Sequence, residues 1–353
     1  MIDVELKVTY CCVKVVDSEL ELTVEPDSAQ AGLVKGEGKK YSITLDKRKF
    51  APGETWCQFK VAMDEAVYWS DKNPFLYILR VSHDNQVVGK ERFGFREFKQ
   101  EGRFLYLNGE RCNLNGAIIQ SSMFRGLKSL ELDDQGNSVR RLLLAHKGLN
   151  FNTLKPHVGP LTAELVYDTC DELGLLMNEV TGLSFWLDAG DWPHKADIFR
   201  KWVMARYNRA CFVTLEVGLE TRRKDFLDTL NEDYSLFKSI DRQNRPVTTI
   251  SGNAPKITAP RTDIEDVHLY PGSIEGHPGD MLSSILHYNW QVWINYGRNM
   301  PVVAWESGCG SAKIAPEEKD QTRRIMMHDP INKFAFVRHI KGAVAKYEMQ
   351  LNA

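Results

Sequence analysis

The residues best suited to chemistry are two glutamates that follow apolar runs in the C-terminal part of the chain. Glu220 closely follows the run 211–217, and Glu306 follows 301–305. Two carboxyl groups that face each other can break a glycosidic bond, because one protonates the leaving oxygen while the other attacks the anomeric carbon. A lone glutamate at a strand end is more often a surface or salt-bridged residue. The small residues 307–310 leave room for a ligand beside Glu306, which favours the functional interpretation.

Other polar residues close neighbouring apolar runs. Tyr270 could donate a hydrogen bond to a nucleophile and His268 could contact a sugar hydroxyl, although a Tyr-Pro turn also packs simply as a corner. Lys155 and His157 could bind substrate hydroxyls, or Lys155 could instead pair with Glu179. These residues form the predicted rim of a carbohydrate site.

Aromatic residues near the same positions could complete such a site. Trp186 and Trp305 lie in or beside loops on the predicted site side, where their faces could stack on the apolar faces of sugars. Trp69, by contrast, looks like core packing. Glu216 is a rival to Glu220, since it interrupts an apolar strand, and it could equally be an inward-facing polar residue or a member of a buried ion pair.

The elements that must position these residues fall into two regions with different patterns. Up to about residue 98 apolar and polar residues alternate, which is typical of short antiparallel strands. The predicted strands include 4–9, 19–24, 41–45, 56–61, 76–81 and 86–93. About seven such strands in about 100 residues are typical of an immunoglobulin-like fold. We therefore predict an immunoglobulin-like β-sandwich over residues 1–98, without chemistry of its own.

After residue 98, short apolar runs alternate with helical stretches. The predicted strands are 113–119, 151–155, 175–179, 211–217, 247–251, 265–270 and 301–306. The predicted helices are 138–148, 162–173, 195–207, 225–243, 282–297 and 331–350. This alternation predicts a (β/α)8 TIM-type barrel over 99–353, in which side chains at the C-terminal ends of strands face the active site. A closed barrel needs an eighth strand, so we expect the barrel to be incomplete at its C-terminus and the chain to be part of a longer protein.

Composition limits the partners. The 353 residues carry 45 Lys and Arg against 47 Asp and Glu, a net charge of −2, which provides no basic field for a nucleic acid or an anionic membrane. No apolar run is long enough to span a bilayer and no targeting segment is recognisable, so we expect a soluble chain. The seven cysteines show no ligand spacing, and we predict neither a metal nor a cofactor. The sequence indicates neither a compartment nor an oligomeric state, although an oligomer is possible.

Several segments together resemble glycoside hydrolase family 2, the family of β-galactosidases, β-glucuronidases and β-mannosidases. Residues 69–77 are similar to its Trp-Ser-Pro-x-x-Pro-x-Leu-Tyr segment, and 93–97 followed by 104–110 resemble its Gly-Phe-Arg junction and Leu-Asn-Gly hairpin. Residues 167–175 resemble its Cys-Asp-Glu-x-Gly helix end. The resemblance covers nearly the full chain and implies a sandwich domain followed by a catalytic barrel.

The resemblance also implies residue roles. The segment 208–220 has the length of the family segment that ends in the acid/base glutamate, which gives Glu220 that role and Glu306 the role of nucleophile. The segment 266–271 is similar to the family's sixth strand and gives Tyr270 the role of orienting the nucleophile. The implied activity is that of a retaining exo-β-glycosidase acting on a carbohydrate through a covalent glycosyl-enzyme intermediate.

Three departures from the family pattern keep other functions open. Leu219 stands where the family has an Asn that would bind the sugar 2-hydroxyl. The jelly-roll domain that precedes the sandwich in the family is absent from this sequence, and so is the eighth strand. These departures favour, as the alternative, a catalytically weak or inactive carbohydrate-binding relative. A third hypothesis is a metal-dependent hydrolase that uses His157, His268 and a carboxylate, but the histidines lack recurring ligand spacing. The sequence does not name the sugar.

Overall fold

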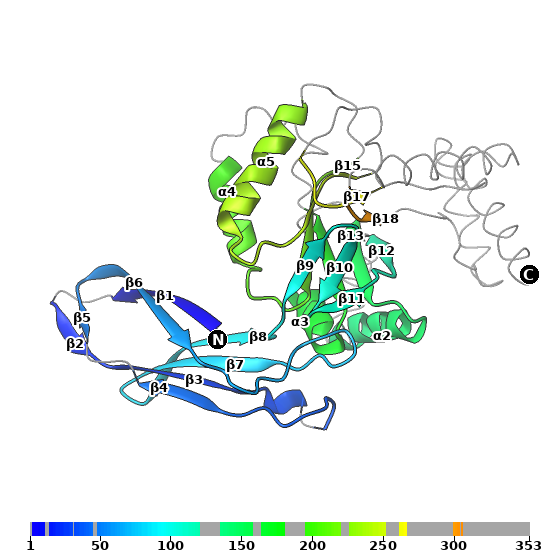
Figure 1. Cartoon of the computed structure of the whole chain (residues 1–353). Helices are drawn as coiled ribbons and strands as arrows, with labels where there is room; N and C mark the ends of the chain where they lie inside the picture. The colour runs from blue at the N-terminus through cyan, green and yellow to red at the C-terminus, as the bar shows by residue number, and fades with distance from the viewer. Residues whose placement is uncertain are drawn as a thin grey trace, which may run out of the picture.

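The computed structural model describes eleven stretches of the chain (Figure 1). They are residues 2–10, 14–30, 32–44, 48–120, 135–157, 164–180, 195–219, 226–251, 261–266, 299–303 and 305. The predicted helices 282–297 and 331–350 lie outside them.

The N-terminal strands form antiparallel sheets packed in two layers. A four-stranded sheet has the order β4 (Tyr41–Thr44), β3 (Leu20–Pro26), β7 (Tyr77–His83), β8 (Gln86–Phe93). Two further pairs are β1 (Ile2–Tyr10) with β6 (Gly53–Val61), and β2 (Val16–Ser18) with β5 (Arg48–Phe50). A short 3-10 helix, η1 (Ser28–Gln30), follows β3.

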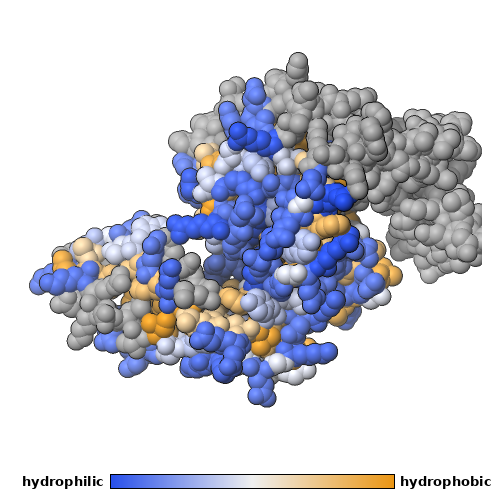
Figure 2. Space-filling view, viewed as in Figure 1, coloured by the Kyte–Doolittle hydropathy of each residue, from blue (hydrophilic) through white to orange (hydrophobic). Residues whose placement is uncertain are grey.

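Alternate residues of these strands form one core. The inward-facing side chains are Leu20, Leu22 and Val24 of β3, Cys57, Phe59 and Val61 of β6, and Tyr77, Leu79 and Val81 of β7. Because successive side chains of a strand point to opposite faces, this period of two buries one face of each layer against the other. The face of the molecule in Figure 2 is mainly hydrophilic, with small hydrophobic groups that include part of this sandwich.

A three-stranded antiparallel sheet links the sandwich to the second region. It consists of β9 (Phe98–Glu101), β10 (Phe104–Leu107) and β11 (Glu110–Cys112). Asn108 and Gly109 join β10 to β11 with φ angles of 53° and 81°, as a type I′ hairpin turn requires. The predicted Leu-Asn-Gly hairpin is therefore confirmed.

The second region contains a curled parallel sheet of seven described strands in sequential order (Figure 1). The strands are β12 (Gly116–Gln120), β13 (Thr153–His157), β14 (Leu176–Val180), β15 (Phe212–Leu219), β16 (Val247–Ser251), β17 (Glu265–Asp266) and β18 (Val302–Val303). Each overlaps a predicted strand, and residues 267–270, 304 and 306 of the last two predicted strands lie outside the described residues. Within the described residues, β12 and β18 are the two edges of this sheet.

In the part of the chain that the structure describes, four helices cover the outer face of the sheet. They are α2 (Gln135–Gly148), α3 (Glu164–Leu173), α4 (Lys195–Met204) and α5 (Phe226–Ile240). The apolar faces of α2 and α3 pack on β13 and β14, whereas α4 and α5 pack on β15 and β16. Among the described residues, no helix is both long and apolar enough to cross a membrane.

The two regions are joined by Trp69, which is fully buried in the core formed by α2, α3 and the parallel strands. Its indole Nε1 donates to the carbonyl oxygen of Asp171 at 2.8 Å. Arg96 donates to the carbonyl oxygens of Ala210 at 2.7 Å and Phe212 at 2.6 Å, next to the start of β15. The expectation that Trp69 is a core residue is confirmed, and the sandwich is held directly to the strand that leads to Glu220.

Candidate active site

The predicted site residues follow strands that end at one edge of the parallel sheet. Strand β15 ends at Leu219, the residue before Glu220 in the sequence, and Trp305 follows β18 and precedes Glu306. Strand β13 ends at His157. Parallel strands place their C-terminal ends on the same side of a sheet, which is where active sites of α/β barrels lie. Five of the predicted residues are outside the described residues: Glu220, Glu306, Tyr270, His268 and Trp186.

Lys155 lies in a buried ion pair on the inner face of the sheet. Its Nζ is 2.7 Å from Glu216 Oε2 and 3.6 Å from Asp266 Oδ2, and the three side chains are at most 1% exposed. Of the interpretations of Glu216, the structure therefore confirms that of a buried ion-pair member. Lys155 pairs with Glu216 rather than Glu179, so the predicted alternative pairing is wrong.

Uncharged side chains from the intervening strands complete this network. Asn178 of β14 donates from Nδ2 to Glu216 Oε2 at 3.2 Å, and Thr214 donates to Asn178 Oδ1 at 2.8 Å. Ser251 of β16 accepts a hydrogen bond from Lys155 Nζ at 3.1 Å and donates one to Asp266 Oδ2. Sequence reasoning missed Asp266, Ser251 and Asn178; their only signal is a polar residue within or at the end of a buried strand.

Glu179 faces the helices instead of the site. The Tyr167 hydroxyl of α3 donates to Glu179 Oε1 at 2.6 Å, and Arg206 Nε donates to the Tyr167 oxygen at 2.7 Å. Burial of the carboxyl raises the pKa of Glu179 to about 7, although the Tyr167 hydrogen bond opposes this. Lys155 and Glu179 are separated because they point to opposite faces of the sheet.

Trp305 lines a cavity between the two edge strands. The cavity has a volume of about 390 Å³ and is bordered by Arg111, Asn115 and Gly116 on one side and by Pro301 and Val302 on the other. Its walls therefore combine the β9–β11 sheet with the start of β12 and with β18. The structure places Trp305 beside this opening, partly exposed.

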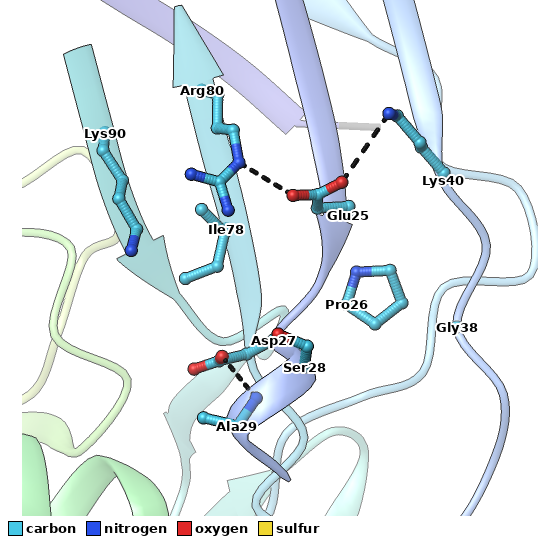
Figure 3. Close-up of a pocket in the computed structure, with 10 residues that line it drawn as sticks. All are labelled: Glu25, Pro26, Asp27, Ser28, Ala29, Gly38, Lys40, Ile78, Arg80 and Lys90. Carbon is cyan, nitrogen blue, oxygen red and sulfur yellow. Dashed lines mark hydrogen bonds and ion pairs between the residues drawn. The ribbon is translucent and has the colours of Figure 1, made fainter. Parts of the chain in front are cut away.

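A second cavity, of about 490 Å³, lies on the outer face of the four-stranded sheet, beside β3, β7 and β8 (Figure 3). Glu25 lies between two cationic side chains that line the cavity. The Oε1 atom of Glu25 is 2.7 Å from Arg80 Nε, and its Oε2 atom is 3.7 Å from Lys40 Nζ. The hydrogen bond from Arg80 lowers the pKa of Glu25. The sequence predicted no chemistry here, and the cavity is remote in sequence from the strand ends that lead to Glu220 and Glu306.

No family model matches this chain. A curated relative, the β-galactosidase BgaC of Bifidobacterium adolescentis, is 28% identical over 120 residues, which is 33% of this chain and 11% of the relative.

In the described residues, no group of three or more His, Cys, Asp or Glu is arranged to hold a metal ion.

The fold is that of glycoside hydrolase family 2 enzymes, which confirms the predicted resemblance. A GH2 β-galacturonidase from Eisenbergiella tayi, bound to galacturonate, matches with a TM-score of 0.64 and 20% identity over 92% of this chain and 58% of its own. A Bifidobacterium dentium β-glucuronidase complexed with coumarin-3-O-glucuronide matches with a TM-score of 0.63 and 19% identity over 84% of this chain and 48% of its own.

A putative β-galactosidase from Bacteroides fragilis has a TM-score of 0.65 and 16% identity over 96% of this chain and 51% of its own. The chain therefore spans between about half and three-fifths of these solved structures, and about a ninth of the curated relative.

Proposed function

We propose that this chain belongs to a retaining exo-β-glycosidase that hydrolyses a terminal β-linked sugar. The observation that carries the proposal is the position of two strand ends: β15 and β18 lead directly to Glu220 and Glu306 in a sheet whose fold is shared with β-glycosidases. Glu306 is the nucleophile and Glu220 is the acid/base.

The reaction has two displacements. Glu306 attacks the anomeric carbon while the Glu220 carboxyl protonates the leaving oxygen, which gives a covalent glycosyl-enzyme and the released alcohol. The Glu220 carboxylate then removes a proton from water, which attacks the same carbon and frees Glu306. The Tyr270 hydroxyl orients the nucleophile by donating a hydrogen bond to it.

Four of the remaining predicted residues contact the sugar in this proposal. His268 and His157 bind hydroxyls, and Trp305 and Trp186 stack on the sugar faces. Lys155 is buried in its ion pair with Glu216, so we assign it an indirect role instead of the contact with a sugar hydroxyl that the sequence predicted. The proposed domains are an immunoglobulin-like sandwich over 1–98 and a (β/α)8 barrel over 99–353.

The test is hydrolysis of a panel of aryl β-glycosides that includes galactosides, glucuronides and galacturonides. We expect Glu220→Gln to lower kcat/KM about 10²- to 10⁴-fold, because general acid catalysis is lost. We expect Glu306→Gln to abolish turnover. Unchanged turnover in Glu306→Gln would remove the assignment. Glu110→Gln, an exposed glutamate in β11, is the matched control and should keep wild-type turnover.

Covalent labelling tests the nucleophile independently. A 2-deoxy-2-fluoro glycoside slows the second displacement and so accumulates the glycosyl-enzyme. We expect the added mass on the peptide that contains Glu306, and no label in Glu306→Gln. A label on a different glutamate would show that another residue is the nucleophile.

A carbohydrate-binding relative with weak or no activity is the second candidate, and it rests on Leu219. Strand β15 ends at this residue, which pairs in register with Ser251. The change Leu219→Asn separates the two functions. A large gain in hydrolysis would mean that the remaining machinery is intact, whereas sugar binding without turnover in both forms would favour the binding protein.

A further inference from the structure

The buried network around Lys155 reaches the backbone beside Glu306. Asp266 Oδ1 accepts a hydrogen bond from the backbone N–H of Trp305 at 3.0 Å, and Trp305 immediately precedes Glu306 in the sequence. The other oxygen, Oδ2, accepts from Ser251 and lies 3.6 Å from Lys155 Nζ. Hydrogen bonds to an ionised acceptor are stronger than neutral ones. One carboxylate therefore fixes the segment before Glu306, and two neighbouring strands fix that carboxylate.

The same network reaches the strand that leads to Glu220. Glu216 lies three residues before the end of β15 at Leu219, and Glu220 is the next residue in the sequence. Glu216 Oε2 is bound by Lys155 of β13 and by Asn178 of β14. The Lys155 ammonium thus joins the two carboxylates that hold the two segments.

Stability alone does not explain such a network. Taking charges out of water costs several kcal/mol per ion, and replacing a buried ion pair by apolar residues of similar volume is often neutral or stabilising. Branched apolar residues, which dominate the interiors of parallel barrels, could have filled the positions that these charged residues occupy. The charged groups instead fix the distances and directions between the strands that they join, because each hydrogen bond restricts the geometry of its partners.

We propose that Asp266 and Lys155 are positioning residues, which act together with Glu216 to fix the separation between the segments that carry Glu306 and Glu220. The inference rests on the proposed function. Retaining hydrolysis needs the two carboxyl groups about 5–5.5 Å apart. A displacement of about 1 Å can lower the rate about 10²-fold.

The test uses Asp266→Asn and Lys155→Met with the aryl glycoside that the wild-type chain hydrolyses best. Asn retains an acceptor for the Trp305 N–H but removes the charge that faces Lys155, and Met keeps the length of Lys155 without its charge. We expect kcat to fall about 10- to 10²-fold in each variant. The inhibition constant of the free product sugar should stay unchanged, because sugar-binding groups are not altered. The rate of labelling by the fluoro glycoside should fall in parallel with kcat.

The matched control is a second buried ion pair, between Arg245 and Asp241, which lies just after the end of α5. Arg245 Nη1 lies 2.6 Å from Asp241 Oδ1, both side chains are 0% exposed, and Arg245 Nε donates to the carbonyl oxygen of Phe212 at the start of β15. Arg245→Met should lower the free energy of unfolding without changing kcat at a temperature where it is folded. An equal loss of kcat in folded Arg245→Met would mean that removing any buried ion pair lowers kcat, and would overturn the inference.

The remaining outcomes separate this inference from the proposed function. If wild-type chain turns over substrate and Glu306 is labelled, but folded Asp266→Asn keeps full kcat, the positioning role is wrong and the proposed function stands. If the wild-type chain neither hydrolyses nor is labelled, both are wrong. If Asp266→Asn and Lys155→Met fail to fold while Arg245→Met folds, the network is structural and the positioning role is overturned.

Discussion

At the scale of single residues, Glu179 is a buried carboxyl whose protonation is linked to folding. Its pKa is raised from 4.5 to about 7 by burial. The folded chain therefore binds this proton more tightly than the unfolded chain, so the contribution of Glu179 to stability is fully present below pH 4.5 and is lost as the pH rises to about 7. A change of this size corresponds to on the order of 3 kcal/mol at most.

We predict that Glu179→Gln makes the free energy of unfolding less dependent on pH between 5 and 8. Gln stays neutral and can still accept the hydrogen bond from Tyr167, so the variant should gain stability relative to wild type as the pH rises. Urea unfolding at several pH values measures this. Glu110→Gln is the exposed control, and the same pH dependence in wild type and Glu179→Gln would contradict the prediction.

At the scale of elements, the junction between β8 and β9 requires a residue without a side chain. A Cβ atom at Gly94 would lie 2.7 Å from the Cβ atoms of Ala210 and Trp69, in a region where neither can retreat easily. We predict that Gly94→Ala lowers the free energy of unfolding by about 1–3 kcal/mol, the usual cost of overpacking. Equilibrium unfolding in urea gives the value.

The control for this change is Gly148→Ala at the end of α2. A Cβ there would meet no atom within 4 Å. Helix propensity makes Ala equal to or better than Gly in a helix, so no loss of stability is expected. Equal destabilisation by both substitutions would show that the close contact at Gly94 is not what limits that position.

At the scale of the whole molecule, Trp69 couples the sandwich to the parallel sheet. It is 0% exposed, it packs in the core of α2 and α3, and its indole donates to Asp171. Arg92 of β8 reinforces the junction through ion pairs with Asp168 at 3.0 Å and Glu172 at 2.8 Å on α3. The two regions should therefore unfold together in the wild-type chain.

We predict that Trp69→Ala lowers stability by about 3–5 kcal/mol, as for large aromatic residues in cores. It should also split one unfolding transition into two, which differential scanning calorimetry would resolve. Trp56→Ala, which removes a tryptophan that is 60% exposed, should leave the transition single. A single transition in Trp69→Ala would place the coupling elsewhere in the junction.

Much of the architecture follows from local patterns. The predicted strands 175–179 and 247–251 are found as β14 and β16, and all of their residues are buried, as expected for a parallel sheet that is covered on both faces. The strands β2 and β5 were not predicted, since three residues are too short to establish a period. The ion-pair partner of Lys155 could not be predicted either, because it depends on which face each strand presents.

The sequence by itself determined the order of strands and helices, the buried nature of Trp69, and the positions at which glutamates follow strands. These properties depend on residues close together in the chain, whose periodicity and motifs record the local conformation. Only the tertiary structure decided that Lys155 joins Glu216 and Asp266, that Asp266 holds the backbone before Glu306, and that Glu179 faces Tyr167. Those contacts join separate strands and helices, so they are set by sheet register and by the curl of the sheet, which no single segment encodes.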